Sequence, residues 1–291
     1  VIPGSFDYHA PTSLDEAIAL LDRFGDSAKI LAGGHSLIPA MRFRLAAPEQ
    51  LIDINRLADL EYIREEDGHL AIGALTRESA LEESPLIRDR YPLLADTVRV
   101  IADPLVRNMA TVGGNLAHAD PANDHPATML AYGAEVVARG PDGSRTISID
   151  DFFVGLFECS LKASEILTEI RIPTPPQGSG GAYLKMERTV GDYAVSAVAV
   201  QLSMDRDTVS AVRVGLTNVN PVHLRATDAE EALAGEAVTD QVLEAAGRAA
   251  AAQCDPSADL RGSVEYKRDL TRVLVKRAVR QAIERARGAA S

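Results

Sequence analysis

The chain has 291 residues, of which 46% are hydrophobic and 25% are charged, a composition typical of globular proteins long enough for two domains. Its formal net charge of −12 argues against a nucleic-acid-binding protein, because such proteins carry a basic face. No run of about eighteen apolar residues occurs, so we expect no membrane span. The first residues lack a basic stretch followed by an apolar one, so no signal peptide is expected and the predicted compartment is the cytoplasm.

The sequence contains only two cysteines, Cys159 and Cys254. They cannot hold a [2Fe–2S] cluster, which takes four thiolates, and they lack the spacing of a zinc site. We expect both to be small buried hydrophobic residues. If the protein carries out redox chemistry, its own electron carrier has to be organic.

The first half of the chain predicts two units of mixed helix and strand. A strand, a helix capped by Thr12 or Ser13, a strand, a helix and a strand form the first unit, which closes near Leu57. In the second unit, a hairpin around Glu66-Asp67-Gly68 precedes a helix capped by Thr76. Further helices are expected over 86–100 and 126–133, and further strands over 135–139, 144–147 and 166–172.

The stretch from Pro173 to Gly181, rich in proline and glycine, is the clearest boundary in the sequence. Beyond it the pattern predicts two antiparallel strands, over 196–204 and 209–217. Three helices follow, over 227–233, 239–253 and 263–287.

Two glycine-rich segments lie about eighty residues apart, Ala32-Gly33-Gly34-His35-Ser36 and Thr111-Val112-Gly113-Gly114-Asn115. Each is interpreted as a turn in which backbone N–H groups can approach an anion without a Cβ in the way. Two such turns favour a pyrophosphate held from two sides, and therefore a dinucleotide. A plain turn is the alternative for either one, because neither matches a G-x-G-x-x-G or a P-loop motif. His35 as a general base is weighed against a loop corner, with Ser36 as a helix cap.

Acids, histidines and prolines gather directly after the second glycine segment, between Leu116 and Pro126. His118 and His125 with Asp120 and Asp124 resemble metal ligands, but their spacing fits no standard site. Asp124 as a helix cap is one alternative, and a carboxylate bound to a ribose or flavin is another.

A third segment runs from Lys185 to Ala194 and contains Gly191-Asp192-Tyr193. The Gly-Asp pair predicts a turn that projects Tyr193. The tyrosine could cover a flat cofactor or pack as an ordinary strand residue, and Lys185 could be a simple exposed charge.

Together these segments resemble the flavoprotein subunits of the molybdenum hydroxylases, closest to the medium subunit of aerobic carbon monoxide dehydrogenase. The resemblance extends over nearly the whole chain, including Gly215-Leu216-Thr217-Asn218-Val219 and Arg261-Gly262-Ser263-Val264-Glu265-Tyr266. It implies an α+β fold with a two-subdomain FAD-binding domain of PCMH/VAO type (1–176, subdomains about 1–57 and 58–176). A C-terminal domain (177–291) of a small antiparallel sheet and a helical bundle follows.

The resemblance also implies noncovalent FAD and the residues that bind it. The expected contacts are Ala32, Gly33, Gly34, His35, Ser36, Leu37, Thr111, Gly113, Gly114, Asn115, Asp120, Asp124, Lys185, Asp192 and Tyr193. Backbone amides of the two glycine segments would hold the pyrophosphate, and Tyr193 would lie by the isoalloxazine and gate it. Arg107 and His118 receive no flavin role.

A large molybdenum-cofactor subunit and a small [2Fe–2S] subunit are the implied partners, in a dimer of heterotrimers. This chain would pass electrons from the clusters to a quinone, in the cytoplasm or at the inner face of the membrane. A related hydroxylase acting on an N-heterocycle or an aldehyde is one alternative. A binding or assembly protein without cofactor is another.

Overall fold

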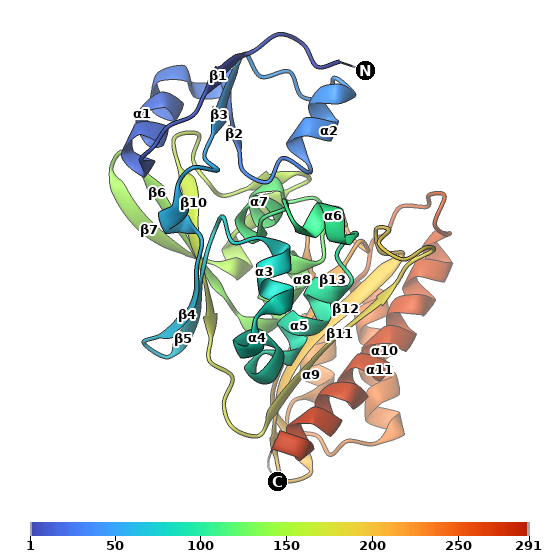
Figure 1. Cartoon of the computed structure of the whole chain (residues 1–291). Coiled ribbons are helices and arrows are strands. Elements are labelled where there is room, and N and C mark those ends of the chain that lie inside the picture. Colours follow the sequence, from blue (N-terminus) through green and yellow to red (C-terminus); the bar gives the residue numbers. More distant parts are fainter. Residues whose placement is uncertain (1, 290–291) are drawn as a thin grey trace.

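The computed structural model describes residues 2–289, and in this part the chain forms three larger sheets with helices packed beside them, together with one small two-stranded sheet (Figure 1). The predicted domain ends at residues 1 and 291 lie outside the described part. The N-terminal unit contains β1 (Asp7–His9), α1 (Leu14–Phe24), β2 (Ala28–Leu31), α2 (Leu37–Arg42) and β3 (Gln50–Asp53). Its strands are parallel in the order β1-β3-β2, and the predicted β-α-β-α-β unit is confirmed.

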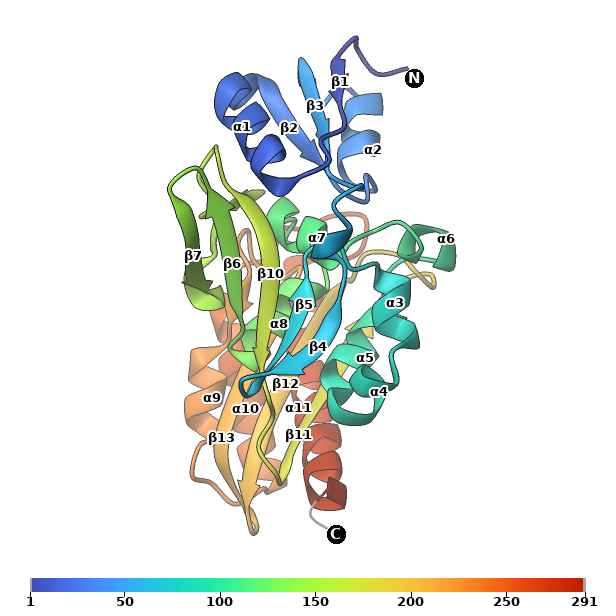
Figure 2. The ribbon, with the colours of Figure 1, turned by 60° about the vertical axis from the view of Figure 1, so that its left-hand side comes forward.

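The two helices of this unit lie on opposite sides of its sheet (Figure 2). Successive side chains of a strand point to opposite faces, so Ile52 packs with the α1 residues Ala17 and Ile18, whereas Leu51 packs with Met41 of α2. Ser13 caps α1 by accepting a hydrogen bond from the Glu16 amide at 3.2 Å. Of the two predicted caps, Thr12 and Ser13, the second is therefore confirmed.

The middle unit contains a five-stranded antiparallel sheet in the order β4-β5-β10-β6-β7. Its strands are β4 (Ile63–Glu66), β5 (His69–Gly73), β6 (Glu135–Gly140), β7 (Gly143–Ser148) and β10 (Ile166–Pro173). The predicted hairpin is β4–β5, and Asp67 and Gly68 turn it with positive φ angles of 48° and 80°. A small hairpin of β8 (Phe153–Gly155) and β9 (Glu158–Cys159) interrupts this unit.

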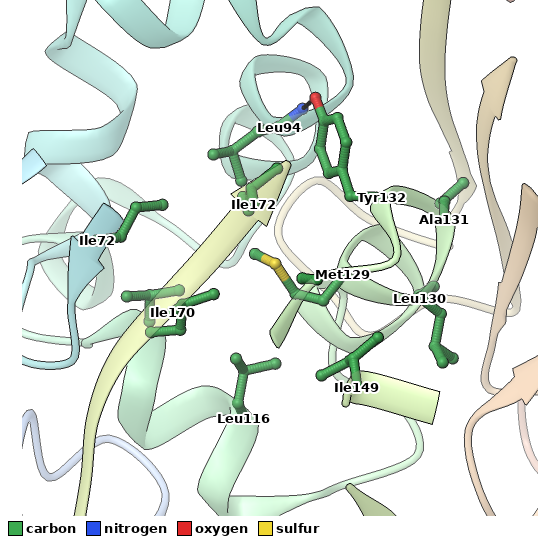
Figure 3. Close-up of a cluster of buried hydrophobic side chains, with 14 of the residues drawn as sticks. Ile72, Leu94, Leu116, Met129, Leu130, Ala131, Tyr132, Ile149, Ile170 and Ile172 are labelled. Atoms are coloured by element: carbon green, nitrogen blue, oxygen red, sulfur yellow. Dashed lines mark hydrogen bonds between the residues drawn. The ribbon is translucent and has the colours of Figure 1, made fainter. Parts of the chain in front are cut away.

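Six helices of the middle unit pack beside this sheet: α3 (Glu78–Glu83), α4 (Pro85–Arg90), α5 (Pro92–Arg99), α6 (Pro104–Arg107), α7 (Val112–His118) and α8 (His125–Tyr132). Figure 3 shows α8 contributing Met129 to a core that Ile170 of β10 and Leu116 of α7 complete. The hydroxyl of Tyr132 accepts a hydrogen bond from the Leu94 amide at 3.3 Å and so has a polar partner inside this apolar cluster (Figure 3).

Two helix predictions are wrong in this unit. Thr76 does not cap a helix, because α3 begins at Glu78 and the Thr76 hydroxyl donates to the Tyr62 carbonyl at 3.0 Å. The expected helix over 86–100 is two helices, α4 and α5, because Pro92 starts a new helix and the intervening Tyr91 leaves helical geometry.

The C-terminal unit has a four-stranded antiparallel sheet of β11 (Ser179–Met186), β12 (Ser196–Asp205), β13 (Thr208–Thr217) and β14 (Leu224–Arg225). Three helices follow: α9 (Thr227–Leu233), α10 (Asp240–Gln253) and α11 (Val264–Ala289). The predicted antiparallel strands and helices are confirmed, and the chain has the predicted α+β fold. Helices α11 and α9 pack on one face of the sheet, with α10 against both of them, while α8 and α5 of the middle unit cover the other face (Figures 1 and 2). The sheet therefore joins the two units.

Cys254 is buried as predicted, but Cys159 is only partly buried. Burial raises the pKa of the Cys254 thiol to about 11 and also raises that of Cys159.

Candidate functional site

The two glycine segments lie against each other in the folded chain. A Cβ on Gly33 would come within 2.2 Å of the Met109 carbonyl oxygen, directly before the second segment, and a Cβ on Gly114 would lie 3.7 Å from the Ala32 methyl group. Contacts below 3.0 Å require the neighbour to move, and here the neighbour is backbone. Glycine at position 33 therefore allows the two segments to approach.

The first segment connects β2 to α2 and exposes unpaired donors. Within the described residues, the backbone amides from Gly33 to Leu37 have no hydrogen-bond acceptor in the protein. Gly34 has a positive φ of 77°, which a residue with a side chain adopts only with strain. Consecutive free amides at such a turn form a concave group of donors suited to an anion.

One expectation for this segment is wrong and another is confirmed. Ser36 occupies the position before α2, but its side chain makes no capping hydrogen bond. The His35 ring does form a loop corner, with Nδ1 at 2.9 Å from the Gly33 carbonyl oxygen. Leu37 begins α2 and packs beside the small cluster of Leu31, Met41 and Leu51.

The second segment is not a turn, as the glycine pair suggested, but the start of α7. Thr111 caps this helix by accepting from the Gly114 amide at 3.2 Å. The Gly113 amide donates to the Ala74 carbonyl, and the Asn115 amide donates to the Thr111 carbonyl. These amides are therefore not free for an anion, contrary to the expectation. Instead, the side-chain Oδ1 of Asn115 is buried without a partner in the described part of the chain.

Asp124 and Lys185 come together from the middle and C-terminal units. Lys185 Nζ lies 3.0 Å from Asp124 Oδ2 and 2.9 Å from the Val100 carbonyl oxygen, and its side chain is only 2% exposed. The Tyr183 hydroxyl donates to Asp124 Oδ1 at 2.6 Å. Burial raises the pKa of Asp124, and the Lys185 ammonium opposes that rise.

This arrangement corrects two of the simpler interpretations. Asp124 precedes α8, but its side chain makes no cap there, because both of its oxygens are used by Lys185 and Tyr183. Lys185 is an internal ion-pair partner and not an exposed charge.

Tyr193 lies in the loop between β11 and β12 with 46% of its surface exposed, so it is not a packed strand residue. The Asp192 carboxylate accepts from the Tyr193 amide at 2.8 Å and from Arg261 Nη2 at 2.7 Å. The hydrogen bond from Arg261 lowers the pKa of Asp192, whereas burial and the nearby acids Asp120 and Asp124 raise that of Tyr193.

The other residues of the His-Asp segment separate into different environments. Asp120 Oδ1 accepts from the Ala122 amide at 3.0 Å. The half-buried His118 ring lies beside Phe157, with ring centroids 5.2 Å apart, and burial lowers its pKa. His125 is fully buried and lies 2.7 Å from Glu78 Oε2. Within residues 2–289, no three His, Cys, Asp or Glu side chains are grouped so that they could hold a metal ion.

Sequence reasoning missed two partners in this region. Arg107 has a structural contact, because it pairs with Glu82 at 2.8 Å and donates to the Ile101 carbonyl oxygen at 2.9 Å. Arg261 holds Asp192, and its Cζ atom lies 5.8 Å from the centre of the Tyr193 ring. No local pattern pairs either arginine with its carboxylate, since the partners are 25 and 69 residues apart.

Comparisons with known proteins show the family and the fold of the chain. The family described as FAD binding domain in molybdopterin dehydrogenase matches residues 4–175, and the CO dehydrogenase flavoprotein C-terminal domain matches residues 181–282. The carbon monoxide dehydrogenase medium chain of Hydrogenophaga pseudoflava is 48% identical over 97% of this chain and 98% of that protein.

Two solved structures have the same fold over nearly the full length. A chain of the Hydrogenophaga pseudoflava carbon monoxide dehydrogenase superimposes with a TM-score of 0.96 at 49% identity, covering 98% of this chain and 99% of the other. A chain of quinoline 2-oxidoreductase from Pseudomonas putida 86 gives 0.92 at 31% identity, covering 100% of both. The chain belongs to the family of FAD-binding medium subunits of the molybdenum hydroxylases, and its similarity to carbon monoxide dehydrogenase medium chains makes it an oxidoreductase subunit.

Proposed function

We propose that this chain carries FAD and passes electrons from partner [2Fe–2S] clusters to an external quinone, in a complex that oxidises carbon monoxide. The observation that carries the proposal is the contact between the two glycine segments, with unpaired amides from Gly33 to Leu37 at their junction. FAD accepts and releases electrons when bound, and the protein binds, orients and tunes it.

The residues present fit such a cofactor. The amides of the first segment offer donors to a pyrophosphate, and the buried, unpaired Oδ1 of Asn115 offers an acceptor. The Ala32 methyl group lies beside Gly114, so the first segment packs against the second at this point. Thr111 and Gly113 hold the second segment in place through their own hydrogen bonds.

We propose that the remaining predicted contacts also lie along the bound cofactor. Asp124 and Lys185 provide a buried pair of opposite charges between the units. Asp120 is one of the acids near Tyr193, and Asp192 accepts a hydrogen bond from the Tyr193 amide. We propose that the exposed Tyr193 ring lies by the isoalloxazine and limits access to it, while the carboxylates and the ammonium contact the rest of the cofactor.

We further propose a dimer of heterotrimers in which a large subunit holds the molybdenum cofactor and a small subunit holds the clusters. The name of the similar Hydrogenophaga protein, a medium chain, supports such an assembly. None of the helices within residues 2–289 is long and apolar enough to cross a membrane. We place the complex in the cytoplasm or at the inner face of the membrane.

A second candidate keeps the subunit but changes the substrate of the complex to an N-heterocycle. The match with the quinoline 2-oxidoreductase chain at a TM-score of 0.92 favours it. The two candidates differ in the molybdenum subunit, where the substrate would be selected. In both of them this chain would carry FAD and transfer electrons in the same way.

The purified native complex tests these proposals. Under anaerobic conditions, carbon monoxide should bleach the visible flavin and iron–sulfur bands. Bleaching by quinoline or an aldehyde, with no response to carbon monoxide, would keep the subunit assignment and change the substrate. A complex without any flavin band would contradict the proposed cofactor and favour an assembly or binding role.

A further inference from the structure

The loop that carries Tyr193 is fixed by backbone contacts on one side. Gly191 has a φ of 82°, and a Cβ there would come within 2.6 Å of the Ala102 carbonyl oxygen. The Asp192 amide donates to the Thr189 carbonyl oxygen at 3.0 Å. These contacts place the backbone of the loop, but they leave the half-exposed Tyr193 ring without restraint.

The restraint on the ring comes from a distant segment, residues 255–262, between α10 and α11. Arg261 donates through Nη2 to Asp192 Oδ1 at 2.7 Å, and its Cζ atom is 5.8 Å from the Tyr193 ring centre. The same Asp192 oxygen accepts the Tyr193 amide at 2.8 Å. One guanidinium therefore contacts the aromatic face and the carboxylate that orients its backbone.

The 255–262 segment is itself rigidly anchored. Asp259 Oδ1 accepts from the amides of Arg261 and Gly262 at 2.8 and 3.2 Å. Asp259 Oδ2 accepts from Lys267 Nζ at 2.8 Å, and this buried ammonium also donates to the Ser257 carbonyl at 2.9 Å. The position of Arg261 is thus fixed by α11 before any cofactor or acceptor arrives.

Arg188 offers a matched comparison within the same contact. It donates to the Leu260 carbonyl oxygen at 3.1 Å and so also ties the Tyr193 loop to the 255–262 segment. Unlike Arg261, it makes no hydrogen bond to Asp192 and no ring contact with Tyr193. Replacing Arg188 therefore tests only the link between the loop and the 255–262 segment, whereas replacing Arg261 also tests the position of the Tyr193 ring.

We infer that Arg261 is a positioning residue, which holds the Tyr193 ring over the flavin and thereby determines how accessible the flavin is to an electron acceptor. This inference rests on the proposed function, because it takes Tyr193 to lie by the isoalloxazine. Arg261 acts through Tyr193 and Asp192, so its role differs from that of a residue that touches the reacting atoms. Lysine would keep the charge next to Asp192 but lose the planar group that lies over the ring.

The first test measures the loop without relying on turnover. In the full chain within its complex, hydrogen exchange of the Tyr193 amide should become several-fold faster in Arg261→Gln and remain as in the wild type in Arg188→Gln. Collisional quenching of flavin fluorescence by iodide should increase in Arg261→Gln, as it should in Tyr193→Ala. Arg261→Lys should restore the slow amide exchange but only part of the shielding from iodide.

The second test asks whether Arg261 acts through the tyrosine. After reduction of the complex, dioxygen should take up the two electrons as hydrogen peroxide several-fold faster in Tyr193→Ala and Arg261→Gln. The double variant should match Tyr193→Ala alone, because residues that act as a unit are not additive. The KM for a quinone should change in these variants more than kcat does.

The outcomes separate the two levels of the proposal. If Tyr193→Ala changes quenching and acceptor kinetics while Arg261→Gln does not, the inference about Arg261 is wrong and the proposed function stands. Additive effects in the double variant would likewise overturn it. If Tyr193→Ala itself changes nothing, both the positioning role and the placement of Tyr193 by the flavin fail.

Discussion

Asp124 and Lys185 form a buried ion pair 3.0 Å apart, and it joins the middle unit to the sheet of the C-terminal unit. Their side chains are 8% and 2% exposed. Removing one partner from a buried pair leaves an uncompensated charge in a site that water cannot reach. Loss of either partner should therefore destabilise the fold, separately from any effect on cofactor binding.

Replacing Lys185 by methionine should destabilise the chain by about 3–5 kcal/mol, because Asp124 keeps its burial and loses its cation. Urea unfolding followed by circular dichroism measures this change. The exposed Lys162, replaced in the same way, is the control and should leave the free energy of unfolding nearly unchanged. An equally small change in Lys185→Met would show that the pair contributes little.

Gly33→Ala should reduce the affinity for FAD by at least about tenfold, which is ~1.4 kcal/mol. The new Cβ would overlap the Met109 carbonyl oxygen at 2.2 Å and push the two glycine segments apart. The expected loss of FAD therefore comes from displaced protein backbone and not from a direct clash between the new Cβ and a pyrophosphate. The ratio of bound FAD to protein after gel filtration measures the effect. Gly4→Ala, at an exposed position with no atom within 4 Å, should retain FAD, and full retention in Gly33→Ala would refute the placement.

His125 and Glu78 make a second buried pair, at 2.7 Å with both side chains fully buried. His125→Leu would leave the Glu78 carboxylate without its donor and should cost about 3–5 kcal/mol. The double variant Glu78→Leu, His125→Leu should be more stable than His125→Leu alone, because no buried carboxyl group is then left without its partner. Thermal and urea unfolding of the three variants test this, and a double variant less stable than the single one would contradict it.

Arg145 and Glu165 predict an acid-sensitive contribution to stability. The hydrogen bond from Arg145 lowers the pKa of Glu165 below its ordinary value of 4.5. A carboxyl whose pKa is lower in the folded state stabilises the fold above about pH 4.5, and this contribution is lost as the pH falls through the folded pKa. Arg145→Gln should therefore destabilise the chain at neutral pH and flatten its stability curve below that value. Carboxyl groups of this kind titrate between about pH 3 and 6. Parallel curves of stability against pH for the wild type and Arg145→Gln over that range would contradict the assignment.

Local patterns were enough to predict most elements of the fold. The hairpin at Asp67-Gly68 followed from turn chemistry, and the helix over 227–233 begins and ends at the predicted residues. Strand β11 was missed because Ser179-Gly180-Gly181 looks like a linker. The structure gives the reason for its glycines, since a Cβ on Gly180 would lie 2.0 Å from the Ala282 carbonyl oxygen of α11. Only the tertiary contact makes glycine suitable in that strand.

The candidate site was predictable as a set of segments but not as a geometry. Glycines and the loop tyrosine identified three regions, and the structure brings two of them, Gly33 and Gly114, side by side. Sequence could not show that Asp124 pairs with Lys185, 61 residues away, instead of capping α8. Nor could it show that Arg261 reaches Asp192 from beyond α10. Long-range ion pairs depend on how the units pack, and no local period encodes that.

We propose that this chain holds FAD and receives its electrons from partner subunits. The most direct test is rapid anaerobic mixing of the native complex with carbon monoxide, while the iron–sulfur and flavin bands are followed separately. Our account predicts that the iron–sulfur bands bleach first and the flavin band follows, and that Gly33→Ala, which weakens FAD binding, reduces only the flavin phase. A flavin band that stays oxidised while the clusters are reduced would contradict it.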